Sequence, residues 1–228
     1  MISMEKHIKL PEEVGKKEDE ETIAVSRKQL YWVLGGMAVI VFIFLVAQSY
    51  FRGLHSFDYE GLSFTKEQFG EIPVYHHYYY YKDSNGELVK NNVFLRNDPR
   101  LNVVPVTGAI IFNQQRRVLL GIDTAHLTSC PKSSLAIAEL SSFLVTNEFE
   151  VIPGVLDKNV SRTEDKKYIS CDLDPSDSVV IIKESNETKI TAQDRCITIE
   201  VANCSMLDAV ERFKLQALID LHERRNTV

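Results

Sequence analysis

Arg117-Val-Leu-Leu-Gly-Ile-Asp123 is a short apolar run of the kind that forms a strand buried on both faces of a parallel sheet. The stretch from Lys132 to Thr146 then carries apolar residues at helical spacing. Pro131 fits its first helical position, because the missing N–H would be unpaired there. Phe149-Glu-Val-Ile-Pro-Gly-Val-Leu156 follows as a second strand. Strand, helix and strand in this order predict a right-handed βαβ unit.

The rest of the C-terminal part extends the same sheet. Val103 to Phe112 is interrupted by proline and glycine, which predicts an edge or bulged strand. After a polar loop, Val179–Lys183 and Cys196–Ala202 read as strands. The last helix begins at Ser205 with a capping-box pattern that ends at Asp208. We therefore expect an α/β fold, or an α+β fold, with a mixed sheet and a C-terminal helix.

Ile72 to Asn97 predicts a β-hairpin around Asn85-Gly86. If the turn has two central residues, the residue numbers of each cross-strand pair sum to 171. The residues of the hairpin then divide between two faces. The first face carries Val74, His76, Tyr78, Tyr80, Val89, Val93 and Leu95, and the opposite face carries Tyr75, His77, Tyr79 and Tyr81. Adjacent His76 and His77 point to opposite faces and cannot share a metal, whereas an aromatic face could bind a partner or a sugar.

Residues 29–51, between Lys28 and Arg52, contain no charged residue. A helix of this length reaches roughly 34 Å, enough to cross a hydrocarbon core. Aromatic residues stand at both ends of the segment, as expected at the headgroup boundary. The long polar stretch that precedes it favours an uncleaved signal anchor over a cleaved signal peptide. The lipid bilayer is thus one expected partner.

Three features orient this anchor. Arg27 and Lys28 lie directly on its N-terminal side, which favours a cytoplasmic N-terminus. All four cysteines follow it, as expected for an oxidising compartment. Three Asn-x-Ser/Thr sequons also follow it, of which Asn159 and Asn186 lie in loops and are our glycosylation candidates, whereas Asn203 lies at a strand-to-helix junction.

The organisation expected is a disordered cytoplasmic tail (1–28), a transmembrane helix (29–51), a membrane-proximal segment (52–71) and an extracytoplasmic α/β domain (72–228). The tail is highly charged and has too few apolar residues to fold. Residues 52–71 contain four aromatic rings and are no Gly/Ser/Pro linker. We expect the chain to join the folded domain within about ten residues of the membrane, because those rings gain by burial.

Composition excludes several function classes. The 228 residues have 26 Lys and Arg against 32 Asp and Glu, a formal net charge of −6 that argues against nucleic acid as a partner. No nucleophile elbow, phosphate loop, zinc motif or paired-carboxylate signature occurs, so no cofactor and no metal are expected. Asp172-x-Asp174-x-x-Asp177 lacks the glycine and the terminal glutamate of a calcium loop.

The one candidate catalytic group is Cys130. It lies at the start of a helix behind the carboxyl end of a strand, where unpaired amides favour the thiolate. Cys130-Pro-Lys-Ser133 resembles a thioredoxin-like motif with one cysteine, and the element order over residues 117–221 fits that fold loosely. His126 and Asp123 would then adjust the reactivity of the thiol. A structural disulfide from Cys130 is the alternative.

Cys130, Cys171, Cys196 and Cys204 are all disulfide candidates. An extended strand over 196–204 would hold Cys196 and Cys204 roughly 26 Å apart, too far for a bond. Two arrangements remain open: Cys130 with Cys196 and Cys171 with Cys204, or Cys130 with Cys204 and Cys171 with Cys196. We favour the first.

Three segments, Arg96–Arg100, Ser133–Phe143 and Val201–Phe213, are similar to those of uncharacterised single-pass membrane proteins of archaea. The resemblance implies a location at the cell membrane and archaeal surface glycosylation of the sequons. It implies no activity. The expected function is that of a non-enzymatic membrane-anchored protein, which presents a binding or assembly domain to an unidentified protein or glycan; the alternative is a membrane-tethered thiol oxidoreductase using Cys130.

Overall fold

The computed structural model describes residues 14–83, 85–113, 115–172 and 176–226, without the side chains of residues 14–29, 50–54 and 226. The chain divides into two compact units, residues 1–54 and 55–228. Most of the first unit is one helix, α1 (Val14–His55). The part of the expected tail before Val14 lies outside the described residues, whereas residues 14–28 are helical.

Within α1, Leu30–Ser49 is long and apolar enough to cross a membrane, and none of its side chains is buried. This apolar helix, together with the two disulfides of the second unit, fits a membrane-anchored extracellular domain.

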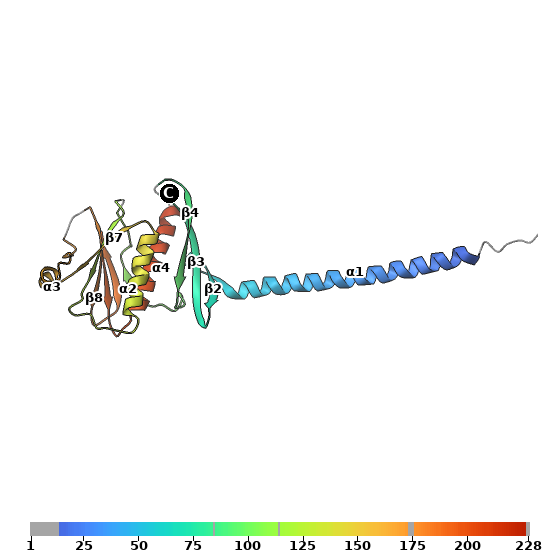
Figure 1. The fold of residues 1–228 in the computed structure, drawn as a ribbon, viewed down its shortest axis with the longest axis horizontal. Helices are drawn as coiled ribbons and strands as arrows, with labels where there is room; N and C mark the ends of the chain where they lie inside the picture. The colour runs from blue at the N-terminus through green and yellow to red at the C-terminus, as the bar shows by residue number, and fades with distance from the viewer. Residues whose placement is uncertain (1–13, 84, 114, 173–175, 227–228) are drawn as a thin grey trace, which may run out of the picture. The chain divides into compact units, whose positions relative to one another are not determined.

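Among its described residues, the second unit holds two sheets and three helices (Figure 1). The expected α/β character is confirmed. The four-stranded sheet is antiparallel and has the order β1-β2-β3-β4, made of β1 (Ser56–Tyr59), β2 (Leu62–Phe69), β3 (Ile72–Lys82) and β4 (Leu88–Leu95). Two of its strands thus come from residues 52–71. Phe64 of β2 is fully buried there, whereas Phe69 is exposed.

The six-stranded sheet has the order β5-β9-β10-β8-β6-β7. Its strands are β5 (Val106–Thr107), β6 (Arg117–Ile122), β7 (Glu150–Val155), β8 (Ser178–Glu184), β9 (Lys189–Gln193) and β10 (Cys196–Val201). Strands β10, β8, β6 and β7 are parallel, and β9 is antiparallel to β10. The expected βαβ unit is present as β6, α2 (Ser133–Thr146) and β7.

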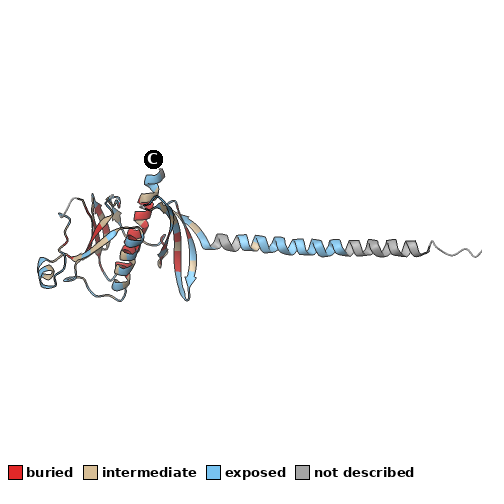
Figure 2. Cartoon of the chain, turned by 45° about the horizontal axis from the view of Figure 1, so that its top comes forward, coloured by how far each residue is buried: buried red, intermediate tan, exposed pale blue. Residues whose placement is uncertain are grey.

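The two long helices of this unit, α2 and α4 (Met206–Asn226), pack between the sheets (Figure 1). Side chains from both sheets and both helices form one core cluster, with Phe64, Leu95, Leu140, Ile182 and Phe213 among its members. Because α4 is covered on two sides, even its charged residues Glu211, Lys214 and Asp220 are buried. Figure 2 shows buried residues along this helix.

The far face of the six-stranded sheet is covered differently. A small cluster around Leu119, Ile169, Val179 and Ile181 packs there against the 157–172 segment. That segment contains a short helix, α3 (Lys158–Thr163), whose first amides are capped by the Asp157 side chain. The sequence predicted neither α3 nor the separate strand β9.

The register of the β3–β4 hairpin corrects our assignment of its faces. His77 pairs with Val93 and Tyr75 pairs with Leu95, so paired numbers add up to 170. Asp83 and Glu87 close a three-residue loop in which Gly86 has a positive φ of 83°. The extra loop residue moves the pairing by one, and a shift of one residue exchanges the two faces of a strand. Tyr75, His77 and Tyr79 therefore face the core together with Val93 and Leu95, and His76, Tyr78 and Tyr80 face outward.

Candidate functional site

The carboxyl edge of the parallel strands, where open α/β sheets bind ligands, carries a disulfide. Cys130 precedes α2 and Cys204 precedes α4, and the two are bonded with their Cα atoms 5.6 Å apart. This bond, with its neighbours Thr128, Ser133 and Glu184, lines a concavity of about 240 Å³. The free thiolate on which a thioredoxin-like mechanism depends is thus absent at Cys130.

The two residues expected to adjust Cys130 lie next to each other. The His126 Nδ1 and an Asp123 carboxylate oxygen are 2.9 Å apart, and His126 is largely exposed. Asp123 also accepts a hydrogen bond from the His126 backbone N–H at 3.3 Å. The pair therefore stabilises the turn that leads to α2. Cys130 itself is bonded to Cys204.

The second disulfide joins Cys171 and Cys196, with a Cα–Cα distance of 5.5 Å. Our preference for the pairs 130–196 and 171–204 was wrong, whereas the exclusion of a 196–204 bond is confirmed. The reason lies in the sheet topology. Cys130 and Cys204 both follow parallel strands and meet at the carboxyl edge, whereas Cys196 begins its strand at the opposite edge.

The outer face of the four-stranded sheet carries the most distinctive exposed feature of the second unit. We call Phe69, His76, Tyr78, Tyr80 and Phe94 the aromatic strip. Four of these side chains are exposed large hydrophobic residues, with Phe69 59% and Tyr78 52% exposed. Contiguous exposed aromatic residues are typical of surfaces that bind another molecule.

The rings of the strip contact one another in sequence. Phe69 packs edge-on to Phe94 at 5.7 Å, and Phe94 stacks on His76 at 4.6 Å. Tyr78 lies 6.3 Å from His76, and Tyr80 lies 6.1 Å from Tyr78. The strip is therefore a continuous, pre-ordered row of rings rather than a set of isolated side chains.

Polar side chains fix the middle of the strip. The His76 ring nitrogens lie 2.7 Å from a Glu67 oxygen and 3.0 Å from Asn92 Oδ1. The Lys90 ammonium lies 4.1 Å from the centre of the Tyr78 ring, a cation–π contact. These contacts hold the rings in one orientation, so little side-chain entropy would be lost when a partner binds.

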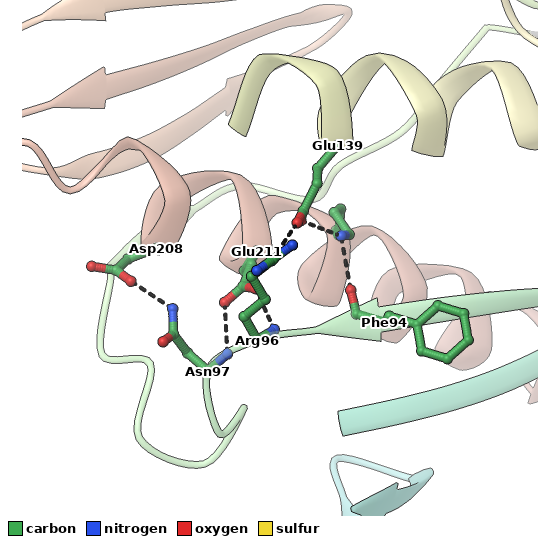
Figure 3. A network of polar contacts seen from close by, with 7 residues as sticks. Phe94, Arg96, Asn97, Glu139, Asp208 and Glu211 are labelled. Atoms are coloured by element: carbon green, nitrogen blue, oxygen red, sulfur yellow. Dashed lines mark hydrogen bonds and ion pairs between the residues drawn. The ribbon is translucent and has the colours of Figure 1, made fainter. Parts of the chain in front are cut away.

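A buried polar network fastens β4, one of the strands that carries the strip, to the helices behind it (Figure 3). Lys214 of α4 donates hydrogen bonds of 3.1 Å to the Phe94 carbonyl and to a Glu139 oxygen of α2. Arg96 contacts the other Glu139 oxygen at 3.2 Å. Since β4 lies at the edge of its sheet, these contacts also occupy backbone groups that would otherwise be open to pairing.

Glu211 completes this network from the same helix. Its carboxylate accepts hydrogen bonds from the backbone N–H groups of Arg96 and Asn97. Burial raises the pKa of Glu211 above its usual range, and the two amide bonds oppose that shift. Asp208 accepts from the Asn97 side chain at 2.7 Å, and so it does not close the capping box expected from the sequence.

The glycosylation candidates lie at the surface. Asn159 is exposed in α3, and Asn186 is exposed in the loop between β8 and β9. Asn203 is exposed but has a positive φ of 49° directly before the bonded Cys204. Among the described residues, no group of three or more metal-ligating side chains comes together.

Comparison with known proteins returns no match: no family model, no curated protein and no solved structure is similar to this chain. The aromatic strip is thus assigned from its geometry. The sequence drew attention to residues 74–81 as aromatic, but it could not show which of them face outward. Phe69, one of the four rings of residues 52–71 that we expected to be buried, is exposed instead and extends the strip onto β2. Phe94, which the sequence analysis did not single out, extends it onto β4.

Proposed function

We propose that this protein is a single-pass membrane protein which presents the unit of residues 55–228 outside the cell as a non-enzymatic binding module. The aromatic strip is its contact surface. The observation that carries the proposal is the continuous row of exposed rings, held in place by Glu67, Asn92 and Lys90. The bonded state of Cys130 supports a binding role over the oxidoreductase alternative.

A protein is the partner that this surface suits best. Sugars bind aromatic residues through an open ring face, but the ring faces in the middle of the strip are used within the molecule. His76 covers one face of Phe94, and Lys90 covers one face of Tyr78. Tyrosine and phenylalanine are enriched at protein interfaces, where a few aromatic residues supply most of the binding energy.

The proposed orientation places the N-terminus in the cytoplasm and the two disulfides outside. Arg27 and Lys28 before the span, and four cysteines after it, support this arrangement. It also makes the exposed Asn159 and Asn186 available for glycosylation.

Site-specific photo-crosslinking in native membranes tests the contact surface. A benzophenone amino acid replaces Tyr80 in the full chain, and the matched control places it at Val103, an exposed residue of a loop. We expect a discrete crosslinked product from position 80 that is absent from position 103, and that disappears when Tyr78→Ser is added. Equal products from both positions, or none from position 80, would refute the strip as a binding surface.

A further inference from the structure

A second concavity lies on the opposite side of the four-stranded sheet, between its inner face and the C-terminal ends of α2 and α4. Its volume is about 440 Å³. We call it the basic pocket, because Lys82, Arg116, Arg224 and Arg225 all line it. This site is separate from the aromatic strip. Tyr79 and Tyr81 of β3 line the pocket on the inner face of the sheet, whereas Tyr78 and Tyr80 of β3 belong to the strip on the outer face.

The floor of the basic pocket is aromatic. Phe112 and Phe149 lie with their ring centres 4.6 Å apart, and both are only partly buried. Phe112 and Phe143 pack on Phe213 of the core, with ring centres 6.2 and 6.4 Å from it. The floor therefore belongs to the rigid core, and the partly exposed rings give an apolar ligand body a surface to cover.

The rim of the basic pocket is cationic, although the whole chain carries a formal net charge of −6. No aspartate or glutamate is among the described residues that line it. Two acids lie close by: Glu148 pairs with Arg116, and Asp83 acts electrostatically on Tyr81. Arg225 uses one of its five N–H donors for the Tyr80 carbonyl at 2.8 Å. A guanidinium with remaining donors suits a carboxylate or a phosphate.

Stabilisation of a helix end does not account for this charge. Arginines in the last turn of α4 interact favourably with the C-terminal end of the helix dipole. Lys82 and Arg116, however, come from the end of β3 and from the residue before β6, and they reach the same pocket from other elements. Tyr79 also lines the pocket, but its hydroxyl is engaged by Asn147 and Asn91. Burial raises the pKa of Tyr79 to about 12, so it adds no negative charge to the site.

We infer that the basic pocket binds a small amphiphilic anion. A carboxylate or phosphate group would lie between Lys82 and Arg225, and an aromatic or short aliphatic body would lie against Phe112 and Phe149. Such a compound could be a soluble acid or the acidic portion of a lipid, which share this chemistry. The site goes beyond the proposed binding function and does not depend on it.

Ligand-observed NMR on the full chain in phosphatidylcholine nanodiscs tests this site, with empty nanodiscs as the reference. The probe is 2-naphthoate; 2-naphthamide has the same rings without the charge, and acetate has the charge without the rings. We expect protein-dependent line broadening for naphthoate and at least tenfold weaker binding of both comparison compounds. Equal binding of naphthamide, or no broadening beyond empty nanodiscs, would overturn the inference.

Variants locate the binding. Lys82→Gln and Arg225→Gln should each weaken naphthoate binding severalfold or more, and Arg162→Gln on the exposed helix α3 is the matched control that should leave it unchanged. Leu221→Trp should abolish binding by filling the pocket while every cation remains, provided that circular dichroism shows the native fold. Unchanged affinity in both basic variants would place the probe elsewhere and refute the site.

A second nanodisc preparation that contains phosphatidylglycerol distinguishes the two sources of the anion. Loss of naphthoate binding in these nanodiscs, by the wild-type protein and by the Arg162→Gln control alike, assigns the pocket to an acidic lipid. Retained binding in both proteins assigns it to a soluble acid.

Discussion

His77 shows how one buried side chain makes stability depend on pH. The ring lies on the inner face of β3, only 7% exposed, and its Nδ1–H donates to the Ser63 carbonyl at 2.8 Å. Burial lowers the pKa of His77 below its ordinary value of 6.5, and the nearby His76 and His222 lower it further. Below pH 6.5 the unfolded chain therefore binds a proton that the folded chain does not.

The free energy of unfolding should consequently fall as the pH falls from 7.5 through 6.5 towards 5.5, because the unfolded state binds more protons there. Urea denaturation of the full chain in detergent measures this dependence. His77→Asn keeps an N–H donor near the Nδ1 position but does not titrate, so its stability should change less over the same range. An identical pH dependence in the variant would show that other groups cause it.

At the scale of elements, the disulfide Cys130–Cys204 connects the N-terminal ends of α2 and α4. It closes a loop of 74 residues, whereas Cys171–Cys196 closes one of 25. The loop-entropy relation gives about 4.5 kcal/mol for the first and about 3.5 kcal/mol for the second. We expect Cys130→Ser with Cys204→Ser to lower the free energy of unfolding by several kcal/mol in denaturant titrations.

Alkylation complements that measurement. Iodoacetamide should not label Cys130 in the native, unreduced protein, and the Cys130→Ser, Cys204→Ser variant should unfold at a lower denaturant concentration than the wild type. A rapidly labelled Cys130, or a double variant as stable as the wild type, would contradict the structural role of this bond and favour the oxidoreductase alternative.

The buried network around Lys214 is the second feature at this scale. Lys214→Ala leaves the Phe94 carbonyl without this donor, whereas Glu139 keeps its contact with Arg96, so we expect a loss of about 1–3 kcal/mol. Lys167→Ala is the matched control, since the Lys167 side chain is exposed and its removal should cost less than about 0.5 kcal/mol. Equal melting temperatures for the two variants would show that the network does not fasten β4.

Sequence patterns predicted the elements better than their arrangement. The βαβ unit followed from hydrophobic runs, which are local signals. Pro131 was expected at the first helical position, but α2 begins at Ser133 and Pro131 precedes its N-cap, Lys132. The faces of the hairpin did not follow, because a single loop residue near Gly86 changes them without changing the strand pattern. The Cys130–Cys204 bond was open to prediction from topology, because both cysteines follow parallel strands and precede the next helix. Topology alone does not give the other bond, since Cys171 also follows a parallel strand, β7, but pairs with Cys196 at the opposite edge.

The candidate sites depend on contacts that no local pattern contains. Phe69 and Phe94 join the aromatic strip through pairing of β2 and β4 with β3. The basic pocket unites residues from Lys82 to Arg225, which only the packed helices and sheets bring together. Such sets depend on the tertiary fold, and a single sequence does not specify them.

At the scale of the whole molecule, the chain combines an apolar helix with a disulfide-bonded α/β unit. Leu30–Ser49 is long enough to span a bilayer, and the disulfides require an oxidising environment to form. A binding module at the cell surface needs residues 55–228 outside and residues 1–28 inside. The proposed contact surface and the proposed glycosylation at Asn159 and Asn186 both depend on this orientation.

Labelling of single introduced cysteines on intact cells tests that orientation most directly. Val103→Cys places a thiol on an exposed loop of the folded unit, and Ser26→Cys places one before the span. A membrane-impermeant maleimide should label position 103 on intact cells and position 26 only after permeabilisation. Labelling of position 26 on intact cells, with position 103 protected until permeabilisation, would contradict the account.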